Sequence, residues 1–288
     1  MNYRHLYHAG NFADVVKHVT LISLLKKLCE KDKPFAVLDA FAGLGLYDLA
    51  SEEALRTKES ESGVGALVSH GLDPRASEVS RDPRVKPVEN SRAHGMQMPP
   101  IITEYLRVTA SHNGLYPGSP MIAASYLREE DQLIAAELHP ADYATLKHNM
   151  RRHNNVHVHH IDAYNAIKAF CPPKEKRGLV LLDPAFEVKD EFTKVLDALR
   201  LIKKRFSAGV VMVWYPIKDK QLVEKFYKDY REVGYAETLT IEFEVNALEG
   251  MKKCGILIAN PPYIEPELRE AMDYLALVMG GGYCFPRA

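Results

Sequence analysis

The sequence predicts an α/β protein whose core is a Rossmann-like sheet of mainly parallel strands. Three observations lead to this prediction. Short apolar runs alternate with stretches of helical periodicity along most of the chain. Four of these runs end in an acidic residue. A long central stretch interrupts the alternation and indicates an insertion.

A helix precedes the first strand, because residues 11–30 carry apolar side chains at helical spacing and Asn11 can cap them. Strands are then predicted at 35–38, 133–136, 156–161, 179–182 and 210–214. Helices are predicted at 141–150, 164–170 and 192–206. Two last strand-like runs, 239–245 and 255–259, predict an antiparallel hairpin at the edge of the sheet.

The interruption determines the predicted domain organisation. We expect residues 1–46 and 115–288 to form the α/β domain, and residues 47–114 to form an inserted helical subdomain. Segments 52–70 and 100–111 have helical patterns. Segment 71–98 is rich in Pro, Ser, Arg and Glu and predicts a mobile loop, in which acids interrupt a basic patch.

The composition excludes several classes of protein. With 47% hydrophobic and 26% charged residues, the chain resembles a soluble globular protein. A formal net charge of -1 gives no global attraction to nucleic acid, so any nucleic-acid surface must be local. No apolar run approaches the roughly 18 residues that span a bilayer, and the N-terminus is not signal-like. We expect a cytoplasmic protein without a membrane partner.

The histidines and cysteines do not form a metal-binding pattern. The 4 cysteines lie far apart, as is typical of reduced structural thiols. His157, His159 and His160 suggest a metal, but neighbours on a strand point to opposite faces. No Cys or carboxylate cluster accompanies them. We expect no metal.

The predicted strand 179–182 ends in Asp183-Pro184-Ala185-Phe186, which suits the binding of a nucleobase amine. Proline ends the strand, and ligands bind beyond the carboxyl ends of strands in open α/β sheets. The Asp183 carboxylate and the Pro184 carbonyl can accept both amine hydrogens while Phe186 stacks on the ring. In the alternative interpretation, Asp183 caps a turn and Phe186 packs in the core.

Three more acids end predicted strands. Asp39 opens a loop, Asp39 to Gly45, in which two glycines allow a ligand to approach the backbone. A dinucleotide-binding loop would have a third glycine where Asp48 stands, so this loop favours a cofactor without phosphates. Glu137 can accept both hydroxyls of a ribose, and Asp162 can accept from an adenine amine.

These residues resemble the class I S-adenosylmethionine-dependent methyltransferases, and Asp183 to Phe186 is similar to the (Asp/Asn)-Pro-Pro-aromatic motif of the adenine-N6 branch. Over essentially the whole chain the sequence resembles the RlmJ family, which methylates an adenine of large-subunit ribosomal RNA. The motifs that carry this resemblance are Tyr3-Arg4-His5, His8-Ala9-Gly10-Asn11, Asp14, Lys17-His18, Tyr116-Pro117-Gly118-Ser119-Pro120, Glu137-Leu138-His139-Pro140 and Trp214-Tyr215-Pro216. The implied fold is a class I methyltransferase sheet with a terminal antiparallel hairpin and an inserted helical subdomain.

The resemblance also implies roles for individual residues. The expected contacts to S-adenosylmethionine are His18, Asp39, Phe41, Gly43, Gly45, Ser119, Glu137, Asp162, Ala163 and Asp183. The expected catalytic residues are Asp183, Pro184 and Phe186, and the expected RNA contacts are Tyr3, Arg4 and Lys17. Lys203-Lys204-Arg205 offers further phosphate contacts. Without the resemblance, Lys17 and His18 would be solvated positions on a polar helix face, and Ser119 an ordinary turn residue.

The chain departs from the family pattern in two motifs. Ala185 replaces the second proline and Phe186 a tyrosine, while Phe41 replaces a histidine in the glycine loop. Ala185 affects the rigidity of the turn rather than its acceptors, because the accepting carbonyl belongs to Pro184. Phe186 keeps the stacking face and loses a hydroxyl.

A second segment, Asn260-Pro261-Pro262-Tyr263, matches the amine-binding motif more closely. It closes the last predicted strand, which runs antiparallel in this methyltransferase fold. Its end is therefore expected at the opposite edge of the sheet from Asp39. We interpret it as a structural turn.

The expected activity is methyl transfer from S-adenosylmethionine to the N6 amine of an adenine in 23S ribosomal RNA. The RNA is expected to be free or partly assembled, since an unpaired base costs least to extrude. One alternative is a nucleic-acid-binding protein with weak or no methyltransferase activity, linked to the use of external DNA. Another is a nicotinamide oxidoreductase, which Asp48 disfavours.

Overall fold

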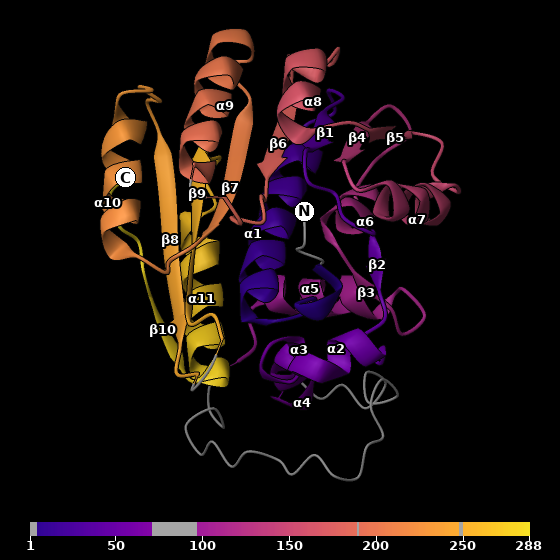
Figure 1. Ribbon diagram of the computed structural model, residues 1–288, viewed down its shortest axis with the longest axis vertical. Coiled ribbons are helices and arrows are strands. Elements are labelled where there is room, and N and C mark those ends of the chain that lie inside the picture. Colours follow the sequence, from indigo (N-terminus) through magenta and orange to yellow (C-terminus); the bar gives the residue numbers. More distant parts are fainter. Residues whose placement is uncertain (1–4, 71–96, 189, 248–249) are drawn as a thin grey trace.

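The computed structural model describes residues 5–70, 97–188, 190–247 and 250–288. Its main feature is an 8-stranded sheet in the order β10-β8-β9-β7-β6-β1-β4-β5 (Figure 1). The strands are β1 (Ala36–Asp39), β4 (Gln132–Glu137), β5 (Val156–His160), β6 (Gly178–Leu182), β7 (Val210–Pro216), β8 (Thr238–Val245), β9 (Lys253–Ala259) and β10 (Gly281–Cys284). Strands β5, β4, β1, β6 and β7 pair in parallel, which confirms the predicted mixed α/β fold.

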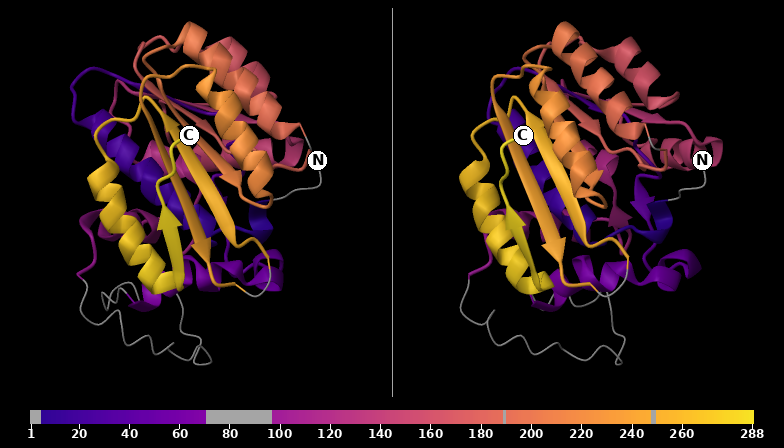
Figure 2. Two further views of the ribbon diagram at one scale, coloured as in Figure 1. Left: turned by 90° about the vertical axis from the view of Figure 1, so that its left-hand side faces the viewer. Right: turned by 60° about the vertical axis from the view of Figure 1, so that its left-hand side comes forward.

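Helices cover both faces of the sheet. The first face packs against α1 (Phe12–Cys29), α6 (Ser119–Ala124), α7 (Pro140–Met150) and α11 (Glu265–Met279). The second packs against α8 (Ala163–Phe170), α9 (Glu191–Arg205) and α10 (Lys220–Arg231). Strand β6 contributes side chains to the hydrophobic core on each face of the sheet. Leu179 and Leu181 point to the first face, and Val180 and Leu182 point to the second. Figure 2 shows α11 and α10 on either side of the antiparallel strands.

Helix α1 begins where the sequence predicts, because the Asn11 side chain accepts a hydrogen bond from the Asp14 N–H at 3.0 Å. The solvated polar face expected for Lys17 and His18 on helical pattern alone is wrong. The two residues are 4% and 1% exposed, since α5, α6 and α11 enclose the helix together with the sheet.

The predicted terminal hairpin is present, but it does not lie at the edge of the sheet. Strand β9 inserts between β7 and β8 and runs antiparallel to both. Strand β10 then pairs with β8 on its outer side. The sequence pattern does not predict β10, because this strand begins with Gly281 and Gly282, and glycine is rare in strands.

The inserted helices are α2 (Glu52–Thr57), α3 (Glu59–Ser62), α4 (Val64–His70) and α5 (Pro100–Ala110), which follow one another between the paired strands β2 (Leu46–Tyr47) and β3 (Tyr116–Pro117). The helical stretch predicted at 52–70 is divided into three, because Lys58 adopts a left-handed φ of 54° and Gly63 ends α3. Most of the predicted loop 71–98 lies outside the described residues. The independence of a 47–114 subdomain stays a prediction.

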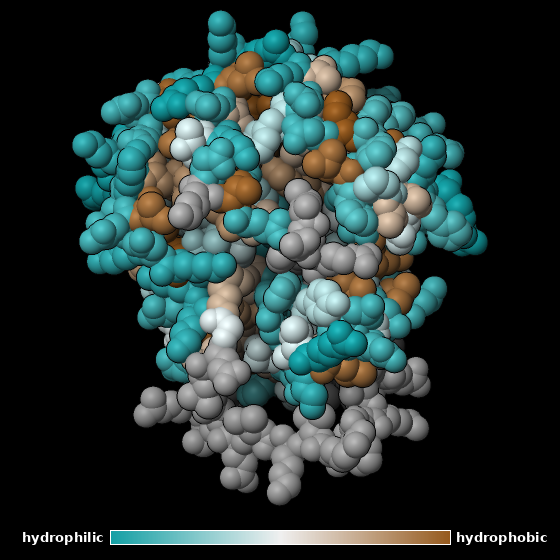
Figure 3. Space-filling model, in the orientation of Figure 1, coloured by the Kyte–Doolittle hydropathy of each residue, from teal (hydrophilic) through white to brown (hydrophobic). Residues whose placement is uncertain are grey.

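The described residues contain no helix that is both long and apolar enough to cross a membrane. The face shown in Figure 3 is mainly hydrophilic, with hydrophobic residues in separate smaller areas. In the same part of the chain, no group of three or more His, Cys, Asp or Glu residues is arranged to hold a metal ion. His157 instead bonds to Gln132, and His159 packs against Phe170.

Candidate active site

The carboxyl ends of the parallel strands border a cavity of about 700 Å³, a size typical of small-molecule sites. The loop after β1, the start of α1 and the segments after β4, β5, β6 and β7 form its walls. Most of the predicted site residues line it: Lys17, His18, Phe41, Gly43, Ser119, Glu137, Asp162, Ala163, Asp183 and Pro184. Three of the four acids that end strands, Glu137, Asp162 and Asp183, therefore converge on one cavity.

Some predicted residues do not lie on the cavity wall. Asp39 is 1% exposed and lies behind Ser119. Gly45 faces Leu146 of α7. Phe186 adopts a left-handed φ of 50° and packs against Phe192, with ring centroids 4.8 Å apart. This agrees with the alternative interpretation of Phe186, and its stacking on a base stays a prediction. Tyr3 and Arg4 lie outside the described residues.

The glycine loop packs against the Tyr47 side chain. Gly43 has a φ of 62°, and a Cβ at this position would lie 2.3 Å from the Tyr47 hydroxyl. The Tyr47 hydroxyl also accepts from the Leu44 N–H at 3.2 Å. Only glycine therefore fits at Gly43, and the loop presents backbone to the cavity.

Glu137 ends β4 and fastens the glycine loop. Its Oε2 accepts from the Gly43 N–H at 3.0 Å and its Oε1 from the His139 N–H at 2.7 Å. Burial raises the pKa of this carboxyl above its usual value. Each oxygen of a carboxylate has a second lone pair, so Glu137 can still accept from ligand hydroxyls.

Asp162 follows β5 and caps helix α8. Its Oδ1 accepts from the Asn165 N–H at 3.0 Å. The other carboxylate oxygen remains an acceptor on the wall of the cavity, next to Ala163.

Asp39 is a buried acid that lies behind the cavity wall. The Ser119 hydroxyl donates to its Oδ2 at 2.6 Å, and the Phe41 N–H donates to its Oδ1 at 3.3 Å. Burial, reinforced by the nearby Asp183 charge, outweighs these hydrogen bonds and raises the pKa of Asp39 to about 7. An ionised Asp39 is therefore costly to the folded protein.

We expect Asp39→Asn to raise the free energy of unfolding at about pH 8 but hardly at about pH 4. The usual pKa of this carboxyl is 3.8, so folding takes up a proton between that value and about 7. The wild type thus loses stability as the pH rises through this range, by on the order of 4 kcal/mol. Asparagine does not ionise. Urea unfolding of both proteins across this range tests the effect, and a difference that does not change with pH would contradict it.

A buried lysine joins two carboxylates at the head of α1. The Lys17 Nζ lies 2.7 Å from Asp14 Oδ1 and 2.5 Å from Asp183 Oδ2. Burial alone would lower the pKa of Lys17, but Asp14 and Asp183 outweigh it and hold this pKa well above its usual value. Lys17 is therefore a fixed cation inside the site, and the expected contact to an RNA phosphate does not agree with this placement.

The role of Asp14 was not assigned from the sequence, although the residue is part of the motifs that carry the family resemblance. Its spacing of three residues from Lys17 places both on one face of a helix and could have indicated the ion pair. No such signal links Lys17 to Asp183, because the two are 166 residues apart in the chain.

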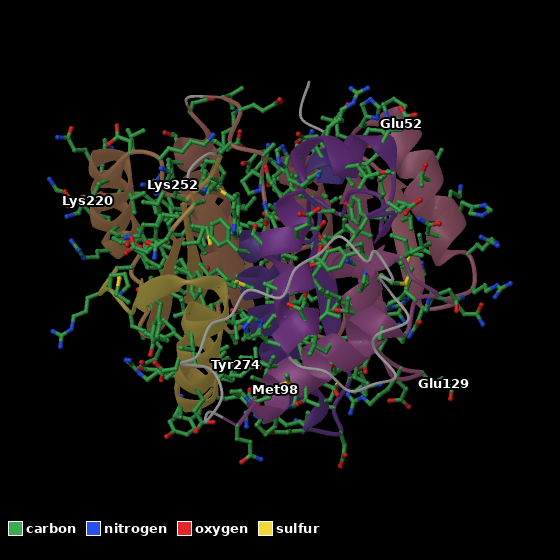
Figure 4. The ribbon with its side chains drawn as sticks, turned by 90° about the horizontal axis from the view of Figure 1, so that it is seen from below. Glu52, Met98, Glu129, Lys220, Lys252 and Tyr274 are labelled. Carbon is green, nitrogen blue, oxygen red and sulfur yellow. The ribbon has the colours of Figure 1, made fainter. Side chains whose placement is uncertain are left out.

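The rim of the cavity contains residues that the sequence did not single out for it. Trp214 and Met251 line it, and Lys218 and Lys252 are exposed lysines on the same wall. Figure 4 shows Lys252 beside the antiparallel strands and Glu52 on the inserted helix α2. The rim thus carries positive charge on the side of β7 and β9.

Asn260 to Tyr263 lie at the other end of the sheet, as predicted. Strand β9 is antiparallel to β7, so its last residue, Ala259, pairs with Val211 near the start of β7. The Asn260 side chain donates to the carbonyls of Ser207 and Gly209 at 2.8 and 2.9 Å, and its φ is 52°. This segment is a structural turn.

Asn260→Ala is expected to lower the free energy of unfolding by about 1–3 kcal/mol, through two lost hydrogen bonds and a strained left-handed alanine. Because Asn260 lies far from the cavity, catalytic turnover should stay close to that of the wild type. Urea unfolding and a turnover assay measure the two effects. A folded but inactive variant would instead identify Asn260 as the amine-binding residue.

Comparisons with known proteins identify the family of this chain. A family model described as "Ribosomal RNA large subunit methyltransferase D, RlmJ" matches residues 95–283. Two proteins named ribosomal RNA large subunit methyltransferase J are similar to the chain. The Haemophilus influenzae protein is 35% identical over 279 residues, and the Escherichia coli protein is 33% identical over 284 residues. Each match covers 96% of this chain and 92% of the relative.

A solved structure extends the similarity to three dimensions. The crystal structure of a Legionella pneumophila protein superposes with a TM-score of 0.83 at 34% sequence identity, and the match covers 98% of both chains. Sequence and structure are thus similar over almost the full length described here. The chain belongs to the RlmJ family of methyltransferases.

Proposed function

We propose that this protein transfers a methyl group from S-adenosylmethionine to the N6 amine of an adenine in 23S ribosomal RNA. The placement of Asp183 carries this proposal. Its carboxylate lies on the cavity wall beside Pro184, and Lys17 holds one of its oxygens at 2.5 Å. The two relatives named ribosomal RNA large subunit methyltransferase J support ribosomal RNA as the substrate.

The residues around the cavity fit S-adenosylmethionine. Glu137 can accept from the ribose hydroxyls, and Asp162 from the adenine amine. The backbone at Gly43 allows close approach, because no side chain fits there. Bound S-adenosylmethionine supplies a methyl group on a positively charged sulfur. A wall that contains Asp14, Asp183 and a single lysine between them favours such a cation.

Asp183 and Pro184 bind and orient the adenine amine in this proposal. Lys17 occupies Oδ2 of Asp183, so Oδ1 and the Pro184 carbonyl are the acceptors that remain for the two amine hydrogens. Holding both hydrogens favours a pyramidal nitrogen, whose lone pair then points toward the methyl group. Asp183 is also the base that takes the proton from the methylated nitrogen.

Trp214 supplies an aromatic ring next to this pair. Val213 pairs with Leu182 across β7 and β6, so the residues that follow, Trp214 and Asp183, are neighbours on the cavity wall. Phe186 contacts the Trp214 ring edge-on, with centroids 6.2 Å apart. We propose that Trp214 contacts the target base directly and that Phe186 supports the Trp214 ring.

The RNA backbone would bind to the rim, with the target base extruded into the cavity. Exposed Lys218 and Lys252 are suitable phosphate contacts on this rim. Arg4 lies outside the described residues and stays an expected RNA contact. Lys203 and Arg205 are poor candidates, because both donate to backbone carbonyls near the opposite edge of the sheet. The substrate is free or partly assembled RNA, in which the base is accessible.

Calorimetric titration with S-adenosylmethionine tests this function against the alternative of a non-catalytic nucleic-acid-binding protein. We expect one molecule to bind per chain, and Glu137→Ala to weaken binding through loss of the ribose acceptor. Failure of the wild type to bind would overturn the proposal and favour the alternative.

A further inference from the structure

Asp14 is buried between residues 8–11 and Lys17, which contacts the proposed amine-binding residue Asp183. It is 2% exposed. Its Oδ1 contacts the Lys17 ammonium at 2.7 Å, and its Oδ2 accepts from the Gly10 N–H at 2.8 Å. Lys17 in turn contacts Asp183 Oδ2 at 2.5 Å. A buried carboxylate, Asp14, and a partly exposed one, Asp183, thus share one ammonium group.

Because Asp14 and Asp183 share the Lys17 ammonium, the position of that ammonium determines which oxygen of Asp183 can accept from the adenine amine. A lysine ammonium has three hydrogens on a long flexible stem, and by itself it does not favour one carboxylate oxygen over the other. Asp14 draws the ammonium toward its own Oδ1, and the contact with Asp183 falls on Oδ2. Without Asp14, Lys17 could settle between both oxygens of Asp183 and occupy the acceptor that the amine needs.

Asp14 is itself held by the inserted helices. Gly10, whose N–H it accepts, has a φ of 77° and accepts through its carbonyl from the Val64 N–H at 2.9 Å. Glu59 of α3 accepts from His8 and from the Asn11 side chain, both at 2.9 Å. Residues 8–11 are therefore fixed between the inserted helices and α1, and Asp14 connects that packing to Lys17.

We propose that Asp14 is a positioning residue for methyl transfer. It holds the Lys17 ammonium on Oδ2 of Asp183 and so keeps Oδ1 and the Pro184 carbonyl open to the amine. This inference rests on the proposed function, because it concerns the same amine-binding pair.

Asp14→Asn removes the negative charge beside Lys17 but keeps the hydrogen bond to Gly10. Asparagine still offers an acceptor to the Gly10 N–H, while its neutral amide group faces Lys17. We expect kcat to fall about 10- to 100-fold. The KM for RNA should change less than about threefold, because Asp14 is not assigned a contact with RNA. The affinity for S-adenosylmethionine should fall less than kcat, because Asp14 acts on the cofactor only through its charge on the cavity wall. Unchanged kcat, or a loss confined to KM or thermal stability, would overturn the inference.

Asp14→Glu provides a second variant that keeps the buried charge and moves it by one methylene. We expect it to fold and to lower kcat about tenfold, because the ammonium is displaced. Wild-type kcat in this variant would also overturn the inference, even if Asp14→Asn fails to fold. Glu267→Gln is the matched control, because Glu267 pairs with Lys26, another lysine of α1, at a distance of 3.1 Å. This ion pair does not line the cavity. The kcat of this variant should equal that of the wild type.

A double variant tests whether Asp14 acts through Lys17. In a Lys17→Met background, Asp14→Asn should cause little further loss of kcat, because the group that it positions is gone. If the two substitutions instead lower kcat by factors that multiply, Asp14 acts independently of Lys17, which would contradict the proposal. An active wild type with an equally active Asp14→Asn variant contradicts this inference alone, whereas a wild type that transfers no methyl group contradicts the proposed function as well.

Discussion

Asp183→Ala is expected to lower the rate of methyl transfer by about three orders of magnitude or more. In the proposed reaction the Asp183 carboxylate holds the amine and takes its proton, so the change deprives the nitrogen of both orientation and base. Methyl transfer from labelled S-adenosylmethionine to 23S RNA measures the effect. Cofactor affinity, measured by calorimetry, should fall far less than the rate.

The fold should survive this substitution. The Asp183 side chain is 15% exposed, and Lys17 keeps its second partner, Asp14, after the change. Asn260→Ala is the control for the choice of motif, because Asn260 belongs to the segment that resembles the amine-binding motif but lies at the other end of the sheet. Retained turnover in Asp183→Ala would contradict the role assigned to Asp183.

Lys17→Met has the second large expected effect, and it combines stability with activity. The change leaves the buried Asp14 and the partly exposed Asp183 without the cation that lies between them, which should cost about 3–5 kcal/mol of unfolding free energy. Methyl transfer should also slow by about 100-fold but stay measurable, because Asp183 loses the contact that orients it. Urea unfolding and single-turnover transfer measure the two losses.

Lys26→Met is the matched control for this prediction. Lys26 belongs to the same helix and pairs with Glu267 at 3.1 Å, but its side chain is 39% exposed. Such partly solvated pairs contribute about 0–1 kcal/mol, so the variant should be nearly as stable as the wild type and fully active. Equal stability of the Lys17 and Lys26 variants would contradict the structural role of the buried network.

Much of the fold could be predicted because it depends on local patterns. The strand of residues 179–182 is a short apolar run that ends at a proline, and β6 spans Gly178–Leu182. Asp39, Glu137, Asp162 and Asp183 follow from one rule: residues at the carboxyl ends of parallel strands meet at one edge of the sheet. The same rule explains why the Asn260 segment could be assigned to the other edge.

The remaining features depend on contacts between distant parts of the chain. The burial of Lys17 results from packing of α1 against α5, α6 and α11, which periodicity within α1 does not reveal. Strand β10 forms because α11 returns residues 281–284 to the free edge of β8, although two glycines give it little strand propensity. The left-handed φ of Phe186, which turns its ring toward Phe192, has no signal in the sequence either.

The most direct test of the proposed activity is methyl transfer to RNA extracted from a strain that lacks the gene. Purified protein and labelled S-adenosylmethionine are incubated with this RNA, and the nucleosides of the large-subunit RNA are then analysed. We predict label in N6-methyladenosine from 23S RNA with the wild type and none with Asp183→Ala. Absence of label with the wild type, or label in a different nucleoside, would contradict the proposed reaction.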